Sequence, residues 1–222
     1  MPRLIAAMLR HGEYRRLADT PDAHQPFPLT ESGLRQARET APLSRKRFVA
    51  EGWQLHAVIE PSNLLRGWQT ARELADMLAE RGLGSAANLT VGQIEDIIET
   101  DPRFPPMPPD WQSNSRYRPP LQGAESLIDA GERVAGHTRQ RMEQLAGQVG
   151  VDTVQVFVGH GPAFRHAALH LGCLAFDDIR RLSMYHARSV HLLVAKDGKP
   201  WRHIGGDWKT RSAVGRYADG ID

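Results

Sequence analysis

The sequence predicts an α/β protein, a three-layer sandwich with a mainly parallel central sheet flanked by helices. Two observations support this. Short apolar runs alternate along the chain with longer segments of helical periodicity, which is typical of strand–helix–strand units. In addition, the runs Leu4–Leu9 and Thr153–Val158 are apolar almost throughout, as expected of strands buried on both faces of a parallel sheet.

The first half of the chain predicts strands and helices in alternation. In order they are a strand at 4–9, a helix from about 30 to 49, a strand at 57–60, a helix from about 65 to 81 and a strand at 89–98. Thr30 is placed to cap the first helix with its side-chain oxygen, and Gly82 stands where the second helix should end.

Residues 101–120 interrupt this pattern. They contain seven prolines, which forbid a regular helix and disfavour a central strand. The segment also contains Phe104, Trp111 and Tyr117, and aromatic residues are uncommon in disordered segments. We therefore expect an ordered surface excursion; a disordered linker is the alternative.

The second half predicts a helix at 125–148, a strand at 153–158, a helix at 162–171, and a hairpin of strands at 190–195 and 201–204. From about Gly205 the sequence is polar, and we expect a frayed or draped tail. The length and the 41% apolar content favour one domain over the whole chain, residues 1–222.

Composition limits the classes of partner. The 28 basic and 26 acidic side chains leave a net charge of +2, which gives no reason to expect nucleic acid or a membrane as a partner.

Cys173 is the single cysteine and cannot form an intramolecular disulfide. The N-terminal apolar run is too short for a signal peptide core or a membrane span. We expect a cytoplasmic protein; the oligomeric state stays open, and a homodimer is compatible with the sequence.

Three segments place cationic or imidazole side chains at the ends of predicted strands. They are Arg10-His11-Gly12, the stretch from Ser62 to Arg66, and Gly159-His160-Gly161. In an open α/β sheet such ends meet at one crevice. Cationic groups gathered there would repel one another unless an anion lay between them, so the segments predict a site of phosphate size.

The same segments carry a family resemblance. LRHGE, SNLLRGWQTA and VFVGHG resemble the signature segments of the histidine phosphatase superfamily, in its phosphoglycerate mutase-like branch, and LTESGLRQA and GAESLIDAGERV add two supporting segments in the usual order. Two positions depart from the pattern: Asn63 stands where proline is common, and Gly67 where alanine is common. Neither change removes a reacting group.

The resemblance implies that His11 is a nucleophile that forms a phosphohistidine, while Arg10, Arg66 and His160 bind the phosphoryl oxygens. It implies no metal and no cofactor. Physical reasoning agrees, because neighbouring arginines favour the neutral imidazole that can attack, and they offset the charge of the transferred group.

Each residue also has an ordinary interpretation. Taken singly, Arg66 would be interpreted as a cation on a helix face, and His160 as a histidine whose ring nitrogens are hydrogen-bonded within a tight turn. The five ordered segments outweigh these interpretations. The remaining histidines show no metal-ligand spacing and are assigned to surface or packing roles; they include His56, His137, His166, His170, His186, His191 and His203.

The family supplies a carboxylic acid downstream of the second arginine to protonate the leaving group. Glu95, Asp96 and Glu99 are candidates, and Glu99 is preferred because IIETD resembles the family's apolar-x-Glu-x-Asp stretch. Glu125 is a weaker candidate, because GAES resembles a helix start. Solvated acids at a strand end are the alternative interpretation.

Substrate selection should come from irregular segments. Arg15 follows the nucleophile motif and Arg165 lies one helical turn after Gly-His-Gly, so both are candidates to bind a substrate carboxylate or second phosphate. Arg16, Arg103, Arg116 and Arg118 are further candidates, although a solvated arginine is the simpler interpretation of each one.

The prediction for function is a metal-independent phosphatase that hydrolyses a small phosphomonoester through a phosphohistidine on His11. One alternative is a mutase, which would shield the phosphohistidine from water. The segment after RHGE lacks the Trp-Asn element and the longer Phe-Thr-Gly-Trp segment usual in the mutases, which favours the phosphatase. The other alternative is a catalytically silent protein that binds a phosphorylated ligand. A phosphatase that acts on proteins also stays open.

Overall fold

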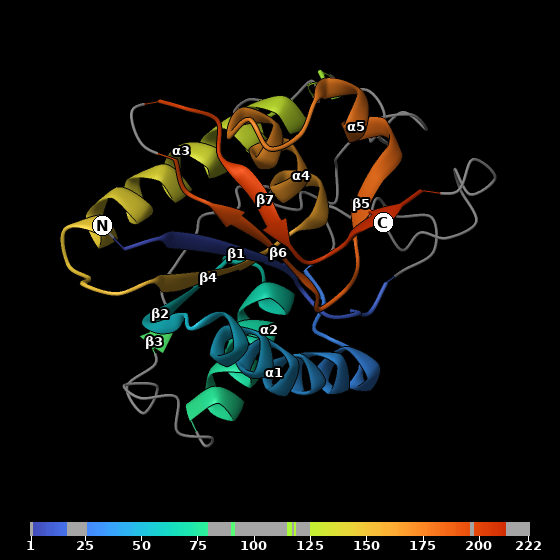
Figure 1. Ribbon diagram of the computed structural model, residues 1–222. Helices are drawn as coiled ribbons and strands as arrows, with labels where there is room; N and C mark the ends of the chain where they lie inside the picture. The colour runs from blue at the N-terminus through green and yellow to red at the C-terminus, as the bar shows by residue number, and fades with distance from the viewer. Residues whose placement is uncertain are drawn as a thin grey trace.

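The computed structural model describes residues 2–16, 26–79, 90–91, 115–116, 118, 125–195 and 198–211 (Figure 1). The elements in chain order are β1 (Leu4–Arg10), α1 (Glu31–Glu51), β2 (Gln54–Pro61), α2 (Leu65–Ala79), β3 (Thr90–Val91), α3 (Leu127–Ala146), β4 (Thr153–Gly159), α4 (Gly161–His170), α5 (Phe176–Arg181), β5 (Leu182–Met184), β6 (Ser189–Leu193), β7 (Arg202–Gly205) and β8 (Trp208–Thr210). None of the helices within these ranges is long and apolar enough to cross a membrane.

A six-stranded sheet in the order β3-β2-β4-β1-β6-β7 forms the middle layer. The pairs β2–β3, β2–β4 and β1–β4 are parallel, whereas β6 and β7 add an antiparallel edge beside β1. A smaller sheet pairs β5 with β8. The expected α/β sandwich with a mainly parallel sheet is confirmed.

The strand β1 divides the core between the two faces of the sheet. Its residues Ile5, Ala7 and Leu9 pack in the cluster that contains the buried side chains of α1 and α2. The alternate residues, including Ala6 and Met8, pack in the cluster with α3 and α4. Figure 1 shows the same layers, with α1 and α2 below the sheet and α3 and α4 above it. The unbroken apolar run of β1 therefore reflects burial on both faces.

The register of the parallel strands brings their carboxyl ends together. Arg10 of β1 lies opposite Gly159 of β4, and Pro61 of β2 lies opposite Val158. The three segments that follow these strands therefore begin close together, at the carboxyl ends of β1, β2 and β4. The antiparallel strand β6 begins at the same edge, since Ser189 pairs with Leu9.

Helix starts follow the sequence signals. Thr30 caps α1, its hydroxyl oxygen accepting a hydrogen bond from the backbone N–H of Gly33 at 3.0 Å. Ser126 caps α3 in a reciprocal capping box with Asp129, so this helix begins at Leu127. The predicted hairpin is confirmed as β6 and β7. Gly82, the predicted end of α2, lies outside the described residues.

Two expectations need correction or restriction. The chain beyond Gly205 was expected to be frayed or draped, but residues 208–210 form β8, which pairs with β5; α5 and β5 were also not predicted. These elements have three to six residues each, too few to show a period. Of the strand expected at 89–98, the structure describes only Thr90–Val91. Of the excursion at 101–120, it describes residues 115, 116 and 118.

Candidate active site

The three predicted segments meet around His11. Its ring lies 5.0 Å from the ring of His160, centroid to centroid, and Arg66 donates from Nε to His11 Nε2 at 3.3 Å. Arg10 precedes His11 at the end of β1, and its charge acts on the imidazole. The structure therefore brings together Arg10, His11, Arg66 and His160.

The environment of His11 fixes its tautomer and its charge. The side chain is buried, with 3% of its surface exposed, and its Nδ1–H donates to the carbonyl oxygen of Gly12 at 2.7 Å. Because a carbonyl only accepts, the lone pair of the neutral ring is on Nε2. Burial, followed by His160, Arg66, Arg10 and His186, holds the pKa of His11 well below 6.5. A neutral imidazole with a bare Nε2 is the nucleophilic form.

Gly12 allows the loop that follows β1, residues 11–14, to pack tightly against α1 and α2. A Cβ atom on Gly12 would lie 2.5 Å from the carbonyl oxygen of Gly33, and a Cβ on Gly33 would lie 1.9 Å from the carbonyl oxygen of Glu13. The N–H of Gly12 donates to Thr70 Oγ1 at 3.0 Å, and the same hydroxyl donates to the carbonyl oxygen of Arg66 at 2.8 Å. These contacts fix the backbone next to His11 against α2, the helix that contains Arg66.

Arg66 lies in the first turn of α2, against an aromatic ring. Its Cζ lies 4.4 Å from the centroid of the Tyr14 ring, a cation–π distance, and the Tyr14 ring meets His11 edge-on at 5.2 Å. Both Arg66 and Tyr14 are buried. Tyr14 was not among the sequence candidates, because its position three residues after His11 carries no motif that marks it as part of a site.

Arg10 is held by hydrogen bonds to β5 and to the segment between β5 and β6. Its Nη1 donates to the carbonyl oxygen of Met184 at 2.7 Å, at the end of β5. The backbone of Arg10 is also bound by the segment that follows, since its N–H donates to Arg188 and its carbonyl accepts from Ala187. The guanidinium is thus oriented by contacts to a segment more than 170 residues away in the sequence.

His160 occupies the N-cap position of α4, and its side chain contacts Ser62, in the segment that leads to Arg66. Its Nε2 lies 2.8 Å from Ser62 Oγ, and Ser62 is buried. A Cβ atom on Gly67 would lie 2.5 Å from that same Ser62 Oγ. The glycine that departs from the family pattern therefore leaves the space in which Ser62 contacts His160.

His186 is a further imidazole of the site. Its Nδ1–H donates to the backbone carbonyl of His11 at 3.0 Å, and the two rings are 5.5 Å apart. Burial, followed by the charge of Arg10, lowers the pKa of His186 to about 4. The sequence assigned His186 to surface or packing roles. The local sequence had no signal for this contact, which joins residues 175 positions apart.

The remaining candidates lie elsewhere or outside the described residues. Glu95, Asp96 and Glu99 are outside them. Glu125 is held by Arg133 in two hydrogen bonds of 2.8 Å each. Arg15 is exposed, and it follows Tyr14 in the sequence.

Arg165 is fully buried, and its Nη1 donates to the carbonyl oxygen of Leu182 at 2.6 Å. That contact connects α4 to β5. Binding of substrate by Arg165 stays a prediction.

Among the described residues, no group of three or more His, Cys, Asp or Glu side chains is arranged to hold a metal ion. The chemistry that this site can perform is that of a neutral nucleophilic imidazole surrounded by guanidinium and imidazole donors. Such a set suits a tetrahedral anion that gains negative charge as it reacts.

A family model matches most of the chain. The chain matches the histidine phosphatase superfamily (branch 1) over residues 7–205. It is 27% identical over 191 residues to the serine/threonine-protein phosphatase Pgam5, mitochondrial, of Drosophila grimshawi; this match covers 86% of the chain and 58% of that protein. The chain thus spans less than two thirds of that relative's length.

Solved structures share the fold. A mycobacterial glucosyl-3-phosphoglycerate phosphatase in complex with VO3 superposes with a TM-score of 0.64 at 20% identity, covering 96% of this chain and 98% of that one. A mutant phosphoserine phosphatase from Entamoeba histolytica in complex with phosphoserine gives 0.62 at 17% identity, covering 93% and 96%. With the family match spanning most of the sequence, the chain belongs to the histidine phosphatase superfamily, branch 1.

Proposed function

We propose that the protein is a metal-independent phosphatase that hydrolyses a small phosphomonoester through a phosphohistidine on His11. The observation that carries this proposal is the state of His11. Its Nδ1–H is bound by Gly12, its Nε2 bears the lone pair, and its pKa is held well below 6.5 by burial and by cationic neighbours. Membership of the family and the name of the Drosophila relative, a protein phosphatase, support the reaction class.

The first step transfers the phosphoryl group to the protein. Nε2 of His11 attacks phosphorus, a P–N bond forms, and the P–O bond to the substrate's alcohol breaks. Arg66 leaves Nε2 and turns its N–H groups to the phosphoryl oxygens, which Arg10 and His160 also bind. These donors stabilise the charge that develops on the equatorial oxygens.

The leaving alkoxide needs a proton, which the proposal assigns to Glu99. A nearby phosphate would favour the protonated carboxylic acid. In the second step water attacks phosphorus and gives a proton to the Glu99 carboxylate, which restores the acid. The P–N bond breaks, inorganic phosphate leaves, and His11 returns to its neutral form. Arg15 and Arg165 are proposed to bind a second anionic group of the substrate.

The test is hydrolysis of p-nitrophenyl phosphate in excess EDTA by the wild type and by His11→Ala. We expect metal-free turnover that the substitution abolishes. A panel of sugar, amino-acid, nucleotide and three-carbon acid phosphates, together with a phosphopeptide, then identifies the substrate class. No turnover on any ester by a folded wild type contradicts the proposal, and the mutase or the silent binding protein then takes its place.

We further propose that the protein acts in the cytoplasm. Burial raises the pKa of the Cys173 thiol to about 12, so this cysteine stays an unreactive thiol, compatible with a reducing compartment. Cell fractionation tests the location. Analytical ultracentrifugation distinguishes the 24.8 kDa monomer from a homodimer.

A further inference from the structure

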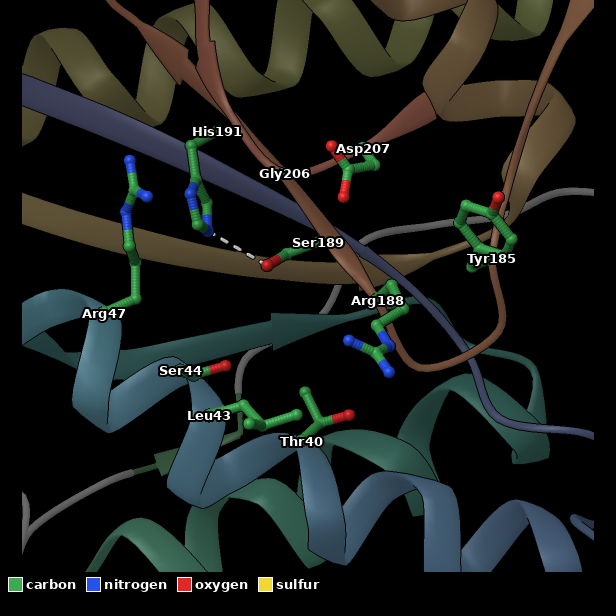
Figure 2. Close-up of a pocket in the computed structure, with 10 residues that line it drawn as sticks. All are labelled: Thr40, Leu43, Ser44, Arg47, Tyr185, Arg188, Ser189, His191, Gly206 and Asp207. Atoms are coloured by element: carbon green, nitrogen blue, oxygen red, sulfur yellow. Dashed lines mark hydrogen bonds between the residues drawn. The ribbon is translucent and has the colours of Figure 1, made fainter. Parts of the chain in front are cut away.

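A cavity lies between α1 and the β6–β7 hairpin, apart from the residues described around His11. It has a volume of about 640 Å³, within the usual range of small-molecule sites. Its walls come from α1, from the segment before and at the start of β6, and from the turn after β7; they are Thr40, Leu43, Ser44, Arg47, Tyr185, Arg188, Ser189, His191, Gly206 and Asp207. Figure 2 shows α1 on one side of this space and the strand with Ser189 and His191 on the other.

Positive charge predominates among the side chains of this cavity. Arg47 and Arg188 supply two guanidiniums, and Asp207 supplies one carboxylate. Arg47 contacts Glu51 at 2.9 Å, but both side chains are more than a third exposed, and an exposed ion pair of this kind is weak. Within the described part of the chain, the Arg188 guanidinium has no ion pair or hydrogen bond. The cavity thus offers cations that an anion can engage.

His191 adds a buried polar atom that lacks a partner. The side chain is 5% exposed, and its Nε2 lies 3.0 Å from Ser189 Oγ. Its Nδ1 has no hydrogen-bond partner among the described residues. Buried ring nitrogens normally take part in a hydrogen bond, so this atom can accept or donate one to a ligand in the cavity. Burial, followed by Arg47 and His203, lowers the pKa of His191 to about 4, so the ring is neutral and can carry a proton on Nδ1.

The Arg47 guanidinium and the His191 ring both lie beside Gly205. A Cβ atom placed on Gly205 would lie 2.9 Å from Arg47 Nη2 and 3.2 Å from His191 Nδ1. In Figure 2 the Arg47 side chain extends from α1 to the level of the His191 ring. A guanidinium and an imidazole N–H that converge in this way can bind two oxygens of one carboxylate or phosphate.

We propose that this cavity is a second binding site, for a small organic anion bearing carboxylate or phosphate groups. Arg47 and His191 bind one anionic group, and Arg188 binds another or its remaining oxygens. The half-exposed Leu43 and Tyr185 contact the carbon skeleton. Asp207 accepts a hydrogen bond from a hydroxyl or amino group of the ligand. The inference of binding does not depend on the phosphatase reaction.

The wall of the cavity adjoins the active site, so competition between the two sites must be tested. Arg10 N–H donates to the carbonyl of Arg188, and the Thr40 hydroxyl donates to the carbonyl of Ala187. Ala187 in turn donates to the carbonyl of Arg10 at 3.0 Å. An experiment therefore has to show that the anion binds while the catalytic pocket is occupied.

The experiment is isothermal titration of the full chain with citrate at constant ionic strength, with and without saturating vanadate. We expect saturable binding that vanadate leaves unchanged. The double variant Arg47→Gln/Arg188→Gln should weaken it at least about tenfold, because it removes two charge-assisted contacts. Arg72→Gln is the matched control, since Arg72 pairs with Asp76 one helical turn away, as Arg47 does with Glu51, but on α2.

His191→Phe provides a second variant that preserves the fold. It keeps a ring against Phe48 and Trp53, removes both nitrogens, and should weaken citrate binding severalfold without lowering Tm. Binding that vanadate abolishes, binding that neither the double variant nor His191→Phe changes, or no saturable binding would each overturn the proposal. If vanadate itself fails to bind, the proposed phosphatase function is in doubt, while the variants still decide the second site.

Discussion

The Nε–H of Arg66 points at Nε2 of His11 across 3.3 Å. This contact identifies Nε2 as the acceptor atom of a neutral ring, and so as the atom that would attack phosphorus. It also places the guanidinium where the phosphoryl group must arrive. Arg66 therefore has two roles in the account: it keeps the imidazole neutral before reaction, and it binds the transferred group afterwards.

The first prediction concerns the shape of the Arg66 side chain. Arg66→Lys keeps a positive charge but loses the planar fork of donors and the stacking on Tyr14. We expect kcat/KM for p-nitrophenyl phosphate to fall by about 10²-fold, the usual effect of losing a preorganised donor. Arg72→Lys, on the exposed face of the same helix, is the control and should leave kcat/KM unchanged. Equal kinetics in the two variants would remove Arg66 from the mechanism.

The second prediction concerns pH. Because the pKa of His11 is held well below 6.5, acid should not reduce activity near the pH at which an ordinary histidine protonates. Arg66→Gln removes one of the charges that lower this pKa, so the pKa of His11 rises. The acidic limb of the kcat/KM profile should then move to higher pH than in the wild type. Measuring both proteins with the same substrate cancels the titration of the substrate, and a limb that stays in place or moves to lower pH contradicts the assignment.

The third prediction concerns His186 as a positioning residue. His186→Ala removes the hydrogen bond to the His11 carbonyl, and we expect kcat to fall by about tenfold as the nucleophile loses its fixed position. His186→Asn places an amide N–H near the position of Nδ1 and should restore most of the loss. His203→Ala, at an exposed position on β7, is the control. Failure of asparagine to recover more activity than alanine would argue against a role through this hydrogen bond.

The fourth prediction concerns the packing of α1 against residues 11–14, the loop that follows β1. In Gly33→Ala the new Cβ would overlap the carbonyl oxygen of Glu13, so the free energy of unfolding should fall by about 1–3 kcal/mol, and the displaced loop should also lose activity. Gly136→Ala, where a Cβ meets nothing within 4 Å, should stabilise α3 by about 0.5–1 kcal/mol. Urea denaturation compares the two, and a Gly33→Ala protein as stable as Gly136→Ala would show that the close approach is not required.

Much of this site could be predicted from the sequence because its main groups follow strong local signals. The buried strands β1 and β4 are apolar runs, and each leads directly to a histidine flanked by glycine. Parallel pairing then brings His11 and His160 to the same edge.

The rest of the site depends on contacts between distant segments. Met184 and His186 bind Arg10 and His11 from the far end of the chain, through a connection between β5 and β6 that no periodicity marks. Tyr14 belongs to the site through the contact of its ring with the Arg66 guanidinium, which joins segments more than fifty residues apart. The hydrogen bond from the Arg165 guanidinium to the backbone carbonyl of Leu182 is another contact between distant segments that the local sequence does not indicate.

Detection of the phosphoenzyme would show directly whether His11 is the nucleophile. The wild type is mixed with p-nitrophenyl phosphate, quenched in alkali within milliseconds, digested and analysed by mass spectrometry. We expect an acid-labile phosphoryl group on the peptide that contains His11, formed and lost at rates that match turnover and absent from His11→Ala. Turnover with no phosphoryl group on His11, or with the group on another residue, would contradict this expectation.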